Sequence, residues 1–318
     1  MKYLITGIAG FVAGHYIEYL FKQDPQTQIS GIDLSQPDFS FLEPSIRKTI
    51  KVYKDSLLDK KRVQDIISEV SPDYIIHLAS QSSVAYSWKN PDESFSNNKN
   101  IFLNLVEGVR KTALNLRILS VGSAEVYGPA KDNNTPLSED TPLNPVSPYA
   151  AARVAQEEIA KKYVSDFGLQ IVSTRSFNHI GPRQTDTFVV SSLAKQVIEA
   201  KKGKRSKIVC GDLEVVRDFI DVRDIVRAYD LLVQKGKPGE IYNVGSGRAY
   251  KLREVLDMLF QRVGIKVPVE VNPGLIRPIE NKVMVSLCQR LEKTTGFKAR
   301  YSISDSLSDI LTYWGNQI

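Results

Sequence analysis

Two kinds of hydrophobic pattern, one typical of strands and one typical of helices, alternate along the first two-thirds of the 318-residue chain. Short runs rich in β-branched and aromatic residues predict strands, and amphipathic stretches of helix length separate them. The predicted strands are Tyr3–Thr6, Gln28–Asp33, Tyr74–Leu78, Arg117–Val121 and Gln170–Arg175. The predicted helices are Val12–Phe21, Lys61–Val70, Ile101–Leu114 and Val154–Asp166. This alternation predicts an α/β fold, a doubly wound parallel sheet with helices on both faces.

From about Asn178 onward, strand-like and helix-like segments no longer alternate regularly. Proline and glycine interrupt the pattern, and an apolar stretch, Ile225–Val233, leads into a strand-like run at Ile241–Val244. We therefore predict a sheet domain over residues 1–176, with returning elements around 218–245. Residues 177–318 are expected to form mainly a smaller mixed α/β lobe that binds the substrate.

Composition narrows the class of protein. Hydrophobic residues make up 42% and charged residues 25% of the chain, as in ordinary globular enzymes. No apolar run approaches the roughly 18 residues of a membrane helix, and Met1 runs into the first strand without a cleavage signal, so we expect a cytoplasmic protein. The two cysteines and three histidines do not cluster at metal-ligand spacing, so we expect free thiols and no metal site.

The net charge is +6. Basic residues are spread along the chain except in Lys201–Lys207. For this segment a solvated turn is a simpler interpretation than a nucleic-acid contact. We therefore expect neither a nucleic-acid nor a membrane partner. A mild positive field suits a substrate that carries a diphosphate.

A glycine pattern follows the first predicted strand. Gly7 and Gly10 precede the helix that starts near Phe11 and Val12. Residues without side chains let the backbone approach a pyrophosphate, and a helix N-terminus offers N–H donors to it. These four residues are therefore predicted to bind a dinucleotide, although a tight strand–helix turn without a ligand is the alternative.

Asp33 ends the second predicted strand. A carboxylate there can accept hydrogen bonds from the adenosine ribose and would repel a 2′-phosphate. This favours NAD(H) and leaves NADP(H) possible. The alternative is a strand-end carboxylate that only braces a turn.

Three motifs together resemble the extended short-chain dehydrogenase/reductase family, whose members remodel nucleotide sugars. They are the Thr6–Gly14 stretch, Ser123–Gly128 and Ser147–Arg153. The resemblance implies a Rossmann-like fold and an NAD(P)-dependent oxidoreductase. The family's active site is a Ser or Thr, a Tyr, and a Lys four residues after the Tyr. This chain has Arg153 at the lysine position.

The chemistry explains why these residue types belong together. Reducing a ketone requires a proton donor, and a free tyrosine hydroxyl has a pKa of about 10. A cation stabilises the phenolate, and residues i and i+4 share a helix face, so Arg153 should lie beside Tyr149. Ser123 would hydrogen-bond the same substrate oxygen. Because guanidinium is larger than ammonium and always charged, we expect retained cofactor binding with altered turnover, and a catalytically impaired protein is the alternative.

The resemblance implies further contacts on both ligands. On the cofactor side it implies Asp55 and Leu57 near the adenine, Leu78, Ala79 and Ser80 beside the phosphates, the helix residue Asn98, and Tyr149 and Arg153 at the nicotinamide ribose. On the substrate side it implies Ser83, Ser123, Glu125, Asn178, Arg183, Val189, Arg217, Arg277 and Glu280. The arginines suit bidentate phosphate recognition, whereas a surface ion pair is the simpler reading of any one of them.

Within the family the GDP-sugar branch is the best match, through His77–Val84, Gly239–Gly247 and Ile310–Trp314. It implies reduction of the C4 ketone of GDP-4-dehydro-6-deoxy-D-mannose to GDP-6-deoxy-D-mannose (GDP-D-rhamnose). A GDP-mannose 4,6-dehydratase or an NAD-dependent epimerase is the alternative. Glu125 leaves dehydration open, although Ala124 stands where dehydratases often carry an acid.

Two further expectations concern assembly and inactivity. A non-catalytic nucleotide-sugar binder remains a third reading because of Arg153. The family also implies a homodimer formed by the tyrosine-bearing helix and the Ile101–Leu114 helix. Apolar Leu103, Val106 and Val109 are compatible with such an interface.

Overall fold

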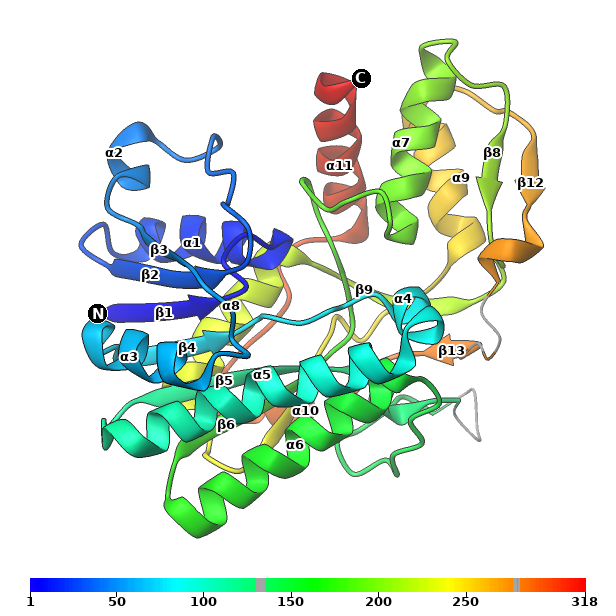
Figure 1. Cartoon of the computed structure of the whole chain (residues 1–318). Coiled ribbons are helices and arrows are strands. Elements are labelled where there is room, and N and C mark those ends of the chain that lie inside the picture. The colour runs from blue at the N-terminus through cyan, green and yellow to red at the C-terminus, as the bar shows by residue number, and fades with distance from the viewer. Residues whose placement is uncertain (130–134, 277–278, 280) are drawn as a thin grey trace.

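The computed structural model describes residues 1–129, 135–276, 279 and 281–318. Its centre is a seven-stranded sheet with strand order β10-β6-β5-β4-β1-β2-β3, in which every pairing is parallel (Figure 1). The strands are β1 (Lys2–Thr6), β2 (Gln28–Asp33), β3 (Lys51–Lys54), β4 (Tyr74–His77), β5 (Arg117–Ser123), β6 (Gln170–Ser176) and β10 (Ile241–Val244).

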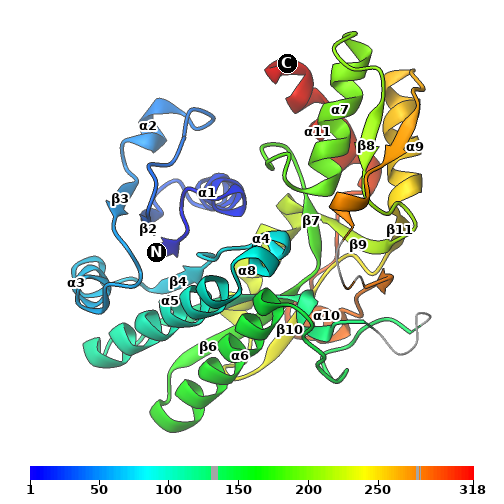
Figure 2. The ribbon, with the colours of Figure 1, turned by 45° about the vertical axis from the view of Figure 1, so that its right-hand side comes forward.

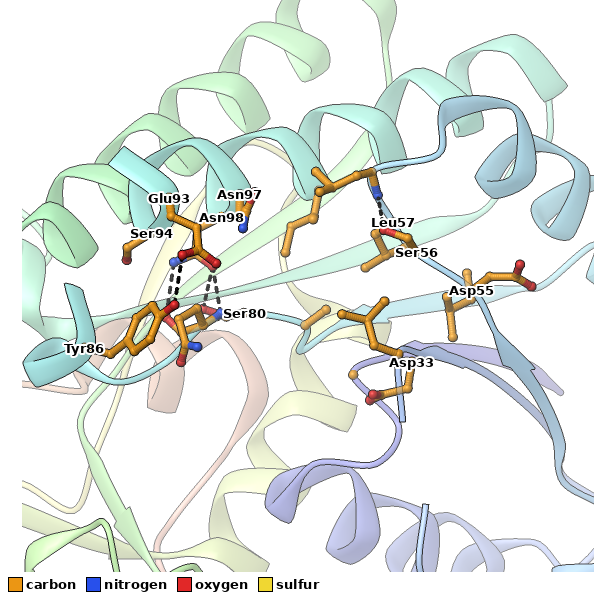
Figure 3. Close-up of a pocket in the computed structure, with 17 residues that line it drawn as sticks. Asp33, Asp55, Ser56, Leu57, Ser80, Tyr86, Glu93, Ser94, Asn97 and Asn98 are labelled. Atoms are coloured by element: carbon orange, nitrogen blue, oxygen red, sulfur yellow. Dashed lines mark hydrogen bonds between the residues drawn. The ribbon is translucent and has the colours of Figure 1, made fainter. Parts of the chain in front are cut away.

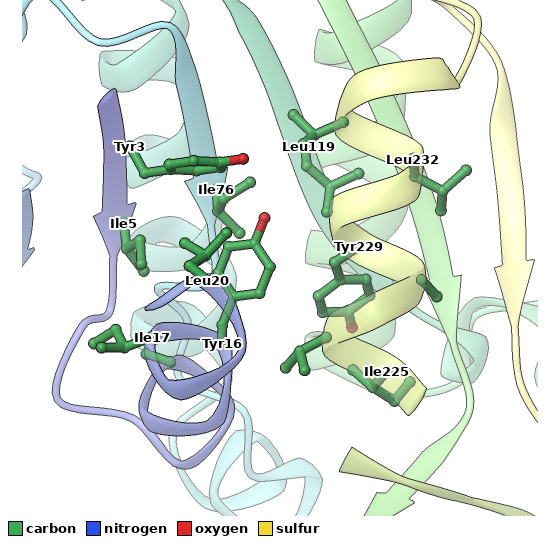
Figure 4. Packing of buried hydrophobic residues seen from close by; sticks show 14 of the residues in the cluster. Tyr3, Ile5, Tyr16, Ile17, Leu20, Ile76, Leu119, Ile225, Tyr229 and Leu232 are labelled. Atoms are coloured by element: carbon green, nitrogen blue, oxygen red, sulfur yellow. The ribbon is translucent and has the colours of Figure 1, made fainter. Parts of the chain in front are cut away.

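Helices cover both faces of this sheet, as the alternating pattern predicts. One face packs against α1 (Phe11–Gln23) and α8 (Val222–Lys235), and Figure 4 shows Tyr16 and Tyr229 of these helices in one cluster with Ile76 and Leu119 of the sheet. The other face packs against α3 (Lys60–Val70), α5 (Pro91–Thr112) and α6 (Pro148–Phe167). The predicted fold class is confirmed.

A second lobe lies beside the carboxyl ends of the strands. Its helices α7 (Val189–Lys201), α9 (Leu252–Val263) and α11 (Ile303–Gln317) lie side by side around their own apolar core (Figure 2). A mixed sheet joins β7 (Asn178–Ile180), β9 (Val216–Asp221), β11 (Ala249–Lys251) and β13 (Val283–Met284), and β8 (Ile208–Cys210) pairs with β12 (Val269–Val271). The short helices are α2 (Pro44–Arg47), α4 (Val84–Lys89), α10 (Gln289–Thr295) and the 3₁₀ turns η1 (Ala124–Tyr127) and η2 (Pro273–Leu275).

Strand boundaries agree with the predictions better than helix starts do. Helix α5 begins at Pro91 and not at Ile101, because its first turns are polar and carry no apolar period. Helix α6 begins at Pro148 and not at Val154, since the Ser147 Oγ accepts a hydrogen bond from the Ala150 N–H at 3.1 Å and starts the helix earlier.

The structure refines the expectation about the basic turn and contradicts part of the expectation about the dimer interface. The basic turn is exposed, but the ammonium groups of Lys202 and Lys204 donate to the carbonyl oxygens of Gly315 and Ile318, so they cap the end of α11. The expected interface role of Val106 and Val109 is wrong, because both are fully buried against the sheet within the chain. Among the helices that the structure describes, none is both long and apolar enough to cross a membrane.

Candidate active site

A cavity of about 310 Å³ opens at the carboxyl ends of β1, β2 and β4. Figure 3 shows Asp33 and Asp55 at one end of it and Ser80, Tyr86 and Asn98 at the other. The predicted cofactor residues that line the cavity are Gly7, Asp33, Asp55, Leu57, Ala79, Ser80 and Asn98. Seven residues from five separate segments thus come together where the sequence predicted a dinucleotide.

The glycine turn allows a close approach of backbones. Gly7 has φ +74°, and a Cβ there would lie 2.8 Å from the main-chain nitrogen of Ala79. The Gly10 N–H donates to the Gly7 carbonyl at 3.0 Å, and Gly10 caps α1 with no side-chain hydrogen bond. The first turn of α1 also contains no acidic residue, so its N–H groups and positive dipole end suit an anionic ligand. Phe11 and Val12 form this turn and do not line the cavity.

Asp33 has two simultaneous roles in the geometry. Its Oδ2 accepts from the Ala9 N–H at 2.9 Å, and its Oδ1 accepts from the Ser35 N–H at 2.9 Å. The carboxylate therefore braces its own turn and the glycine loop while it faces the cavity. The turn-bracing alternative and the ribose-binding prediction are compatible.

The segment after β4 is shaped by Asn98. This buried side chain accepts from the Gln81 N–H at 2.8 Å and from the Ser80 hydroxyl at 3.2 Å, and it donates to the Gln81 carbonyl (Figure 3). Asn98 thus holds the loop that lines the cavity opposite the glycine turn. Nearby, Asp55 forms an ion pair with Arg62 at 3.1 Å.

Ser123, Tyr149 and Arg153 lie beyond this cavity, at the end of β5 and in the first turns of α6. The Ser123 Oγ accepts from the Glu125 N–H at 3.2 Å, which starts η1. Tyr149 and Arg153 are both buried, and the guanidinium carbon lies 5.1 Å from the centre of the tyrosine ring. The expected proximity of cation and phenol is observed, and their catalytic roles remain predictions.

Sequence reasoning missed the partner of Arg153. The Nη1 of Arg153 donates to the Gln156 Oε1 at 2.6 Å and to the Val121 carbonyl at 3.1 Å. Gln156 in turn donates to the Ser120 hydroxyl at 2.8 Å. The i, i+3 spacing on one helix could have identified Gln156, but the buried acceptors on β5 could not be identified locally.

Two histidines near these elements are held neutral. Burial, with a smaller contribution from the Arg153 charge, lowers the pKa of His77 to about 3. His77 Nδ1 hydrogen-bonds the Thr6 hydroxyl at 2.8 Å, which links the ends of β4 and β1. His179 stacks on Phe11 with parallel rings 6.2 Å apart, and burial lowers its pKa. His179 therefore joins the second lobe to the start of α1, a contact that the sequence analysis did not anticipate.

The predicted substrate residues are dispersed over the second lobe and its approach. Asn178 is half-buried in β7, Arg217 is buried in β9, Val189 is exposed at the start of α7, and the Ser83 Oγ caps α4 by accepting from the Tyr86 N–H. Arg277 and Glu280 lie outside the described residues. The substrate-binding roles of all these residues remain predictions.

Arg183 has specific partners in the structure. Its Nη2 donates to Glu18 of α1 at 2.5 Å, and its guanidinium carbon lies 3.9 Å from the centre of the Phe41 ring. It therefore ties the loop after β7 to α1. Binding a diphosphate through Arg183 would require this pairing to be shared or released.

The part of the chain that the structure describes offers no evident metal site. Within residues 1–129, 135–276, 279 and 281–318, no three His, Cys, Asp or Glu side chains gather in a metal-binding arrangement. Both cysteines are buried free thiols.

The comparisons with known proteins agree with this geometry. A curated GDP-6-deoxy-D-mannose reductase from Pseudomonas aeruginosa is 29% identical over 318 residues, covering 100% of this chain and 98% of the relative. GDP-mannose 4,6 dehydratase 1 from Arabidopsis thaliana is 27% identical, covering 93% of this chain and 85% of the relative.

Solved structures give the same picture. The structure of RMD from Pseudomonas aeruginosa with NADPH superposes with a TM-score of 0.85 at 28% identity, covering 100% of this chain and 99% of the other. The UDP-glucose 4-epimerase of Thermus thermophilus with NAD superposes with a TM-score of 0.88 at 27% identity, with both chains fully covered.

The family described as GDP-mannose 4,6 dehydratase matches residues 4–310. The chain therefore belongs to this family, and it is an NAD(P)-dependent enzyme of the short-chain dehydrogenase/reductase type that acts on nucleotide sugars.

Proposed function

We propose that this protein reduces the C4 ketone of GDP-4-dehydro-6-deoxy-D-mannose to GDP-6-deoxy-D-mannose with NADH or NADPH. The observation that carries this proposal is the share of each relative's length that this chain matches. The Pseudomonas reductase matches this chain from end to end, whereas the dehydratases from Arabidopsis, Sordaria araneosa and Vibrio cholerae are matched over 60–85% of their own length. The match to the reductase thus leaves almost none of that relative unmatched.

The proposed step uses three side chains. When bound, the nicotinamide cofactor supplies a hydride to C4 of the sugar. Tyr149 donates its phenolic proton to the ketone oxygen, so that the carbonyl becomes an alcohol and the phenolate remains. Ser123 orients that oxygen, and the nearby Arg153 charge stabilises the phenolate until solvent returns the proton.

The cofactor fits the residues that are present. The Gly7 turn has no room for a side chain, the N-terminus of α1 carries no capping side chain, and the adjoining cavity presents Asp33. The Arg153 Nε is buried and has no partner among the described residues, so it is available to a ribose hydroxyl. Asp33 favours NADH over NADPH because its carboxylate would repel a 2′-phosphate.

The second lobe, mainly residues 177–318, is proposed to hold the GDP moiety. Asn178, Arg217 and Arg277 would bind the diphosphate, and Glu280 would accept from ribose hydroxyls. We further propose a homodimer that uses the outer faces of α5 and α6, where Leu103 is only half-buried.

The test is a direct assay of the reaction. Freshly generated GDP-4-dehydro-6-deoxy-D-mannose is mixed with the protein and NADH or NADPH, and nicotinamide absorbance is followed together with NMR of the product. Stoichiometric oxidation of the cofactor with formation of GDP-6-deoxy-D-mannose supports the proposal. Absence of oxidation, with the cofactor still bound, refutes it.

A second candidate is a GDP-mannose 4,6-dehydratase. The family match and the position of Glu125 in η1, two residues after Ser123, favour it. A dehydratase would convert GDP-mannose to the keto sugar without net oxidation of the cofactor, because the hydride that it accepts is returned. Incubation with GDP-mannose and NAD or NADP alone distinguishes the two activities.

A further inference from the structure

Arg153 is held by a buried network of neutral groups. Arg153 and Gln156 are 5% and 1% exposed, and they lie on the inner side of α6. The Arg153 Nη1 donates both to the Val121 carbonyl at 3.1 Å and to the Gln156 Oε1 at 2.6 Å. The Gln156 Nε2 donates to the Ser120 hydroxyl at 2.8 Å and to the same carbonyl at 3.2 Å. The amide of Gln156 therefore bridges the guanidinium to β5.

This network restricts the direction of the guanidinium. Because the group is planar, holding Nη1 by two acceptors also sets where the remaining N–H groups point. One of these, Nε, is buried and unpaired among the described residues. A buried N–H without a partner is costly, so a ligand group is expected to complete it.

The network also leaves the charge intact. No acid among the described residues forms a salt bridge with Arg153, and both acceptors of its Nη1 are uncharged. A glutamate at position 156 could accept from the guanidinium but would neutralise it, and it has no N–H to donate to the Val121 carbonyl. A glutamine orients the cation and preserves its field at Tyr149, whose ring centre is 5.1 Å from the guanidinium carbon.

We propose that Gln156 is a positioning residue that fixes the Arg153 guanidinium beside Tyr149 without neutralising it, so that this site is built for arginine and not for lysine. The inference rests on the proposed function, in which Arg153 serves Tyr149 and the nicotinamide ribose. A lysine at position 153 presents its three N–H donors from one nitrogen, whereas the guanidinium holds Val121 and Gln156 with Nη1 and keeps Nε as a separate donor in a fixed direction. Arg153→Lys is therefore expected to lower kcat.

A double-mutant cycle tests this coupling. Gln156→Met, Arg153→Met and the double variant are compared for NADH dissociation constant by fluorescence titration, for kcat and KM with the keto sugar, and for unfolding by urea. Gln156→Met is expected to weaken NADH binding and lower kcat by about tenfold each, the loss of one hydrogen bond to a charged group, with the KM for the sugar unchanged. In the Arg153→Met background it should have no further effect on either quantity.

The matched control is Gln196→Met in α7. Gln196 is also buried, and its Nε2 donates to the Val209 carbonyl at 3.0 Å and to the Ser192 hydroxyl at 3.2 Å, in the second lobe. This control should lose stability while keeping the NADH dissociation constant and kcat of the unmodified protein. Equal effects of Gln156→Met in both backgrounds, or a folded Gln156→Met protein with unchanged binding and kcat, would overturn the proposal.

A second variant covers failure of Gln156→Met to fold. Gln156→Glu has the same shape and keeps an acceptor for Arg153, but it neutralises the guanidinium, so kcat should fall at least tenfold in a folded protein. Unchanged kcat in Gln156→Glu contradicts the inference. If the unmodified protein reduces no keto sugar, the proposed function fails, and the NADH titrations still decide whether Gln156 positions Arg153.

Discussion

Replacing Gly7 by alanine perturbs the cofactor turn in two separable ways. The residue has φ +74°, a left-handed conformation that costs an L-residue about 1–2 kcal/mol. The added Cβ would also lie 2.8 Å from the nitrogen and 2.9 Å from the Cα of Ala79. These are main-chain atoms of the loop after β4, so no side-chain rotation relieves the contact, and such overpacking costs about 1–3 kcal/mol. Gly7→Ala should therefore lower the free energy of unfolding by roughly 2–5 kcal/mol.

Gly168→Ala is the control that separates the two terms. Gly168 ends α6 with φ +69°, and a Cβ there would meet no atom within 4 Å. It should therefore show only the backbone cost of about 1–2 kcal/mol. Urea unfolding of both variants measures the difference, and fluorescence titration with NADH measures binding.

Binding gives the functional half of the prediction. Gly7→Ala displaces the loop that carries Ala79 and Ser80, both of which line the cavity, so NADH binding should weaken at least tenfold. Gly168→Ala should bind NADH like the unmodified protein. If Gly7→Ala is no less stable than Gly168→Ala, the predicted contact with the Ala79 main chain does not exist. If Gly7→Ala binds NADH with unchanged affinity, the glycine turn is not part of the cofactor site.

Three further predictions concern stability, cofactor choice and pH. Arg175→Met should lower the free energy of unfolding by about 3–5 kcal/mol, because it leaves buried Glu157 without its bidentate partner, and a urea-unfolding loss below about 1 kcal/mol would contradict this. Asp33→Ser should shift the ratio of kcat/KM toward NADPH, as it removes the charge that repels a 2′-phosphate, and an unchanged ratio would argue against a ribose-binding Asp33. Burial, followed by the charge of Arg183, lowers the pKa of His15 to about 4, so the unfolded chain takes up a proton that the folded chain excludes. The free energy of unfolding should therefore fall as pH drops from about 6.5 to about 4, by roughly 3 kcal/mol from this group, and a His15→Gln profile with the same slope as the unmodified protein would refute the assignment.

Local patterns in the sequence were sufficient for much of the fold and for part of the site. Strand β2 was predicted with its observed bounds, Gln28–Asp33. The family motif together with the i, i+4 spacing predicted that Tyr149 and Arg153 are neighbours, and they are, although the helix predicted from apolar period began only at Val154. Gly7 was found from the glycine pattern between a strand and a helix, and Asp33 from its position at the end of the second strand.

The starts of helices were harder to predict from the sequence, because capping residues, and not the period of the apolar residues, decide where a helix begins. The polar first turns of α5 are helical because Pro91 begins the helix and Asp92 and Glu93 suit its positive end. The outer face of this helix also could not be assigned from its apolar residues, because Val106 and Val109 face the core that α5 shares with the sheet.

The sequence by itself determined the alternating elements, the glycine turn and the Tyr149–Arg153 pair, because each depends on the geometry of one strand, turn or helix. Only the tertiary structure decided which groups complete them. Arg183 pairs with Glu18, and Gln156 links Arg153 to Ser120, through contacts between segments far apart in the chain. Such partners follow from how helices pack on the sheet, a property of the whole fold that no local pattern contains.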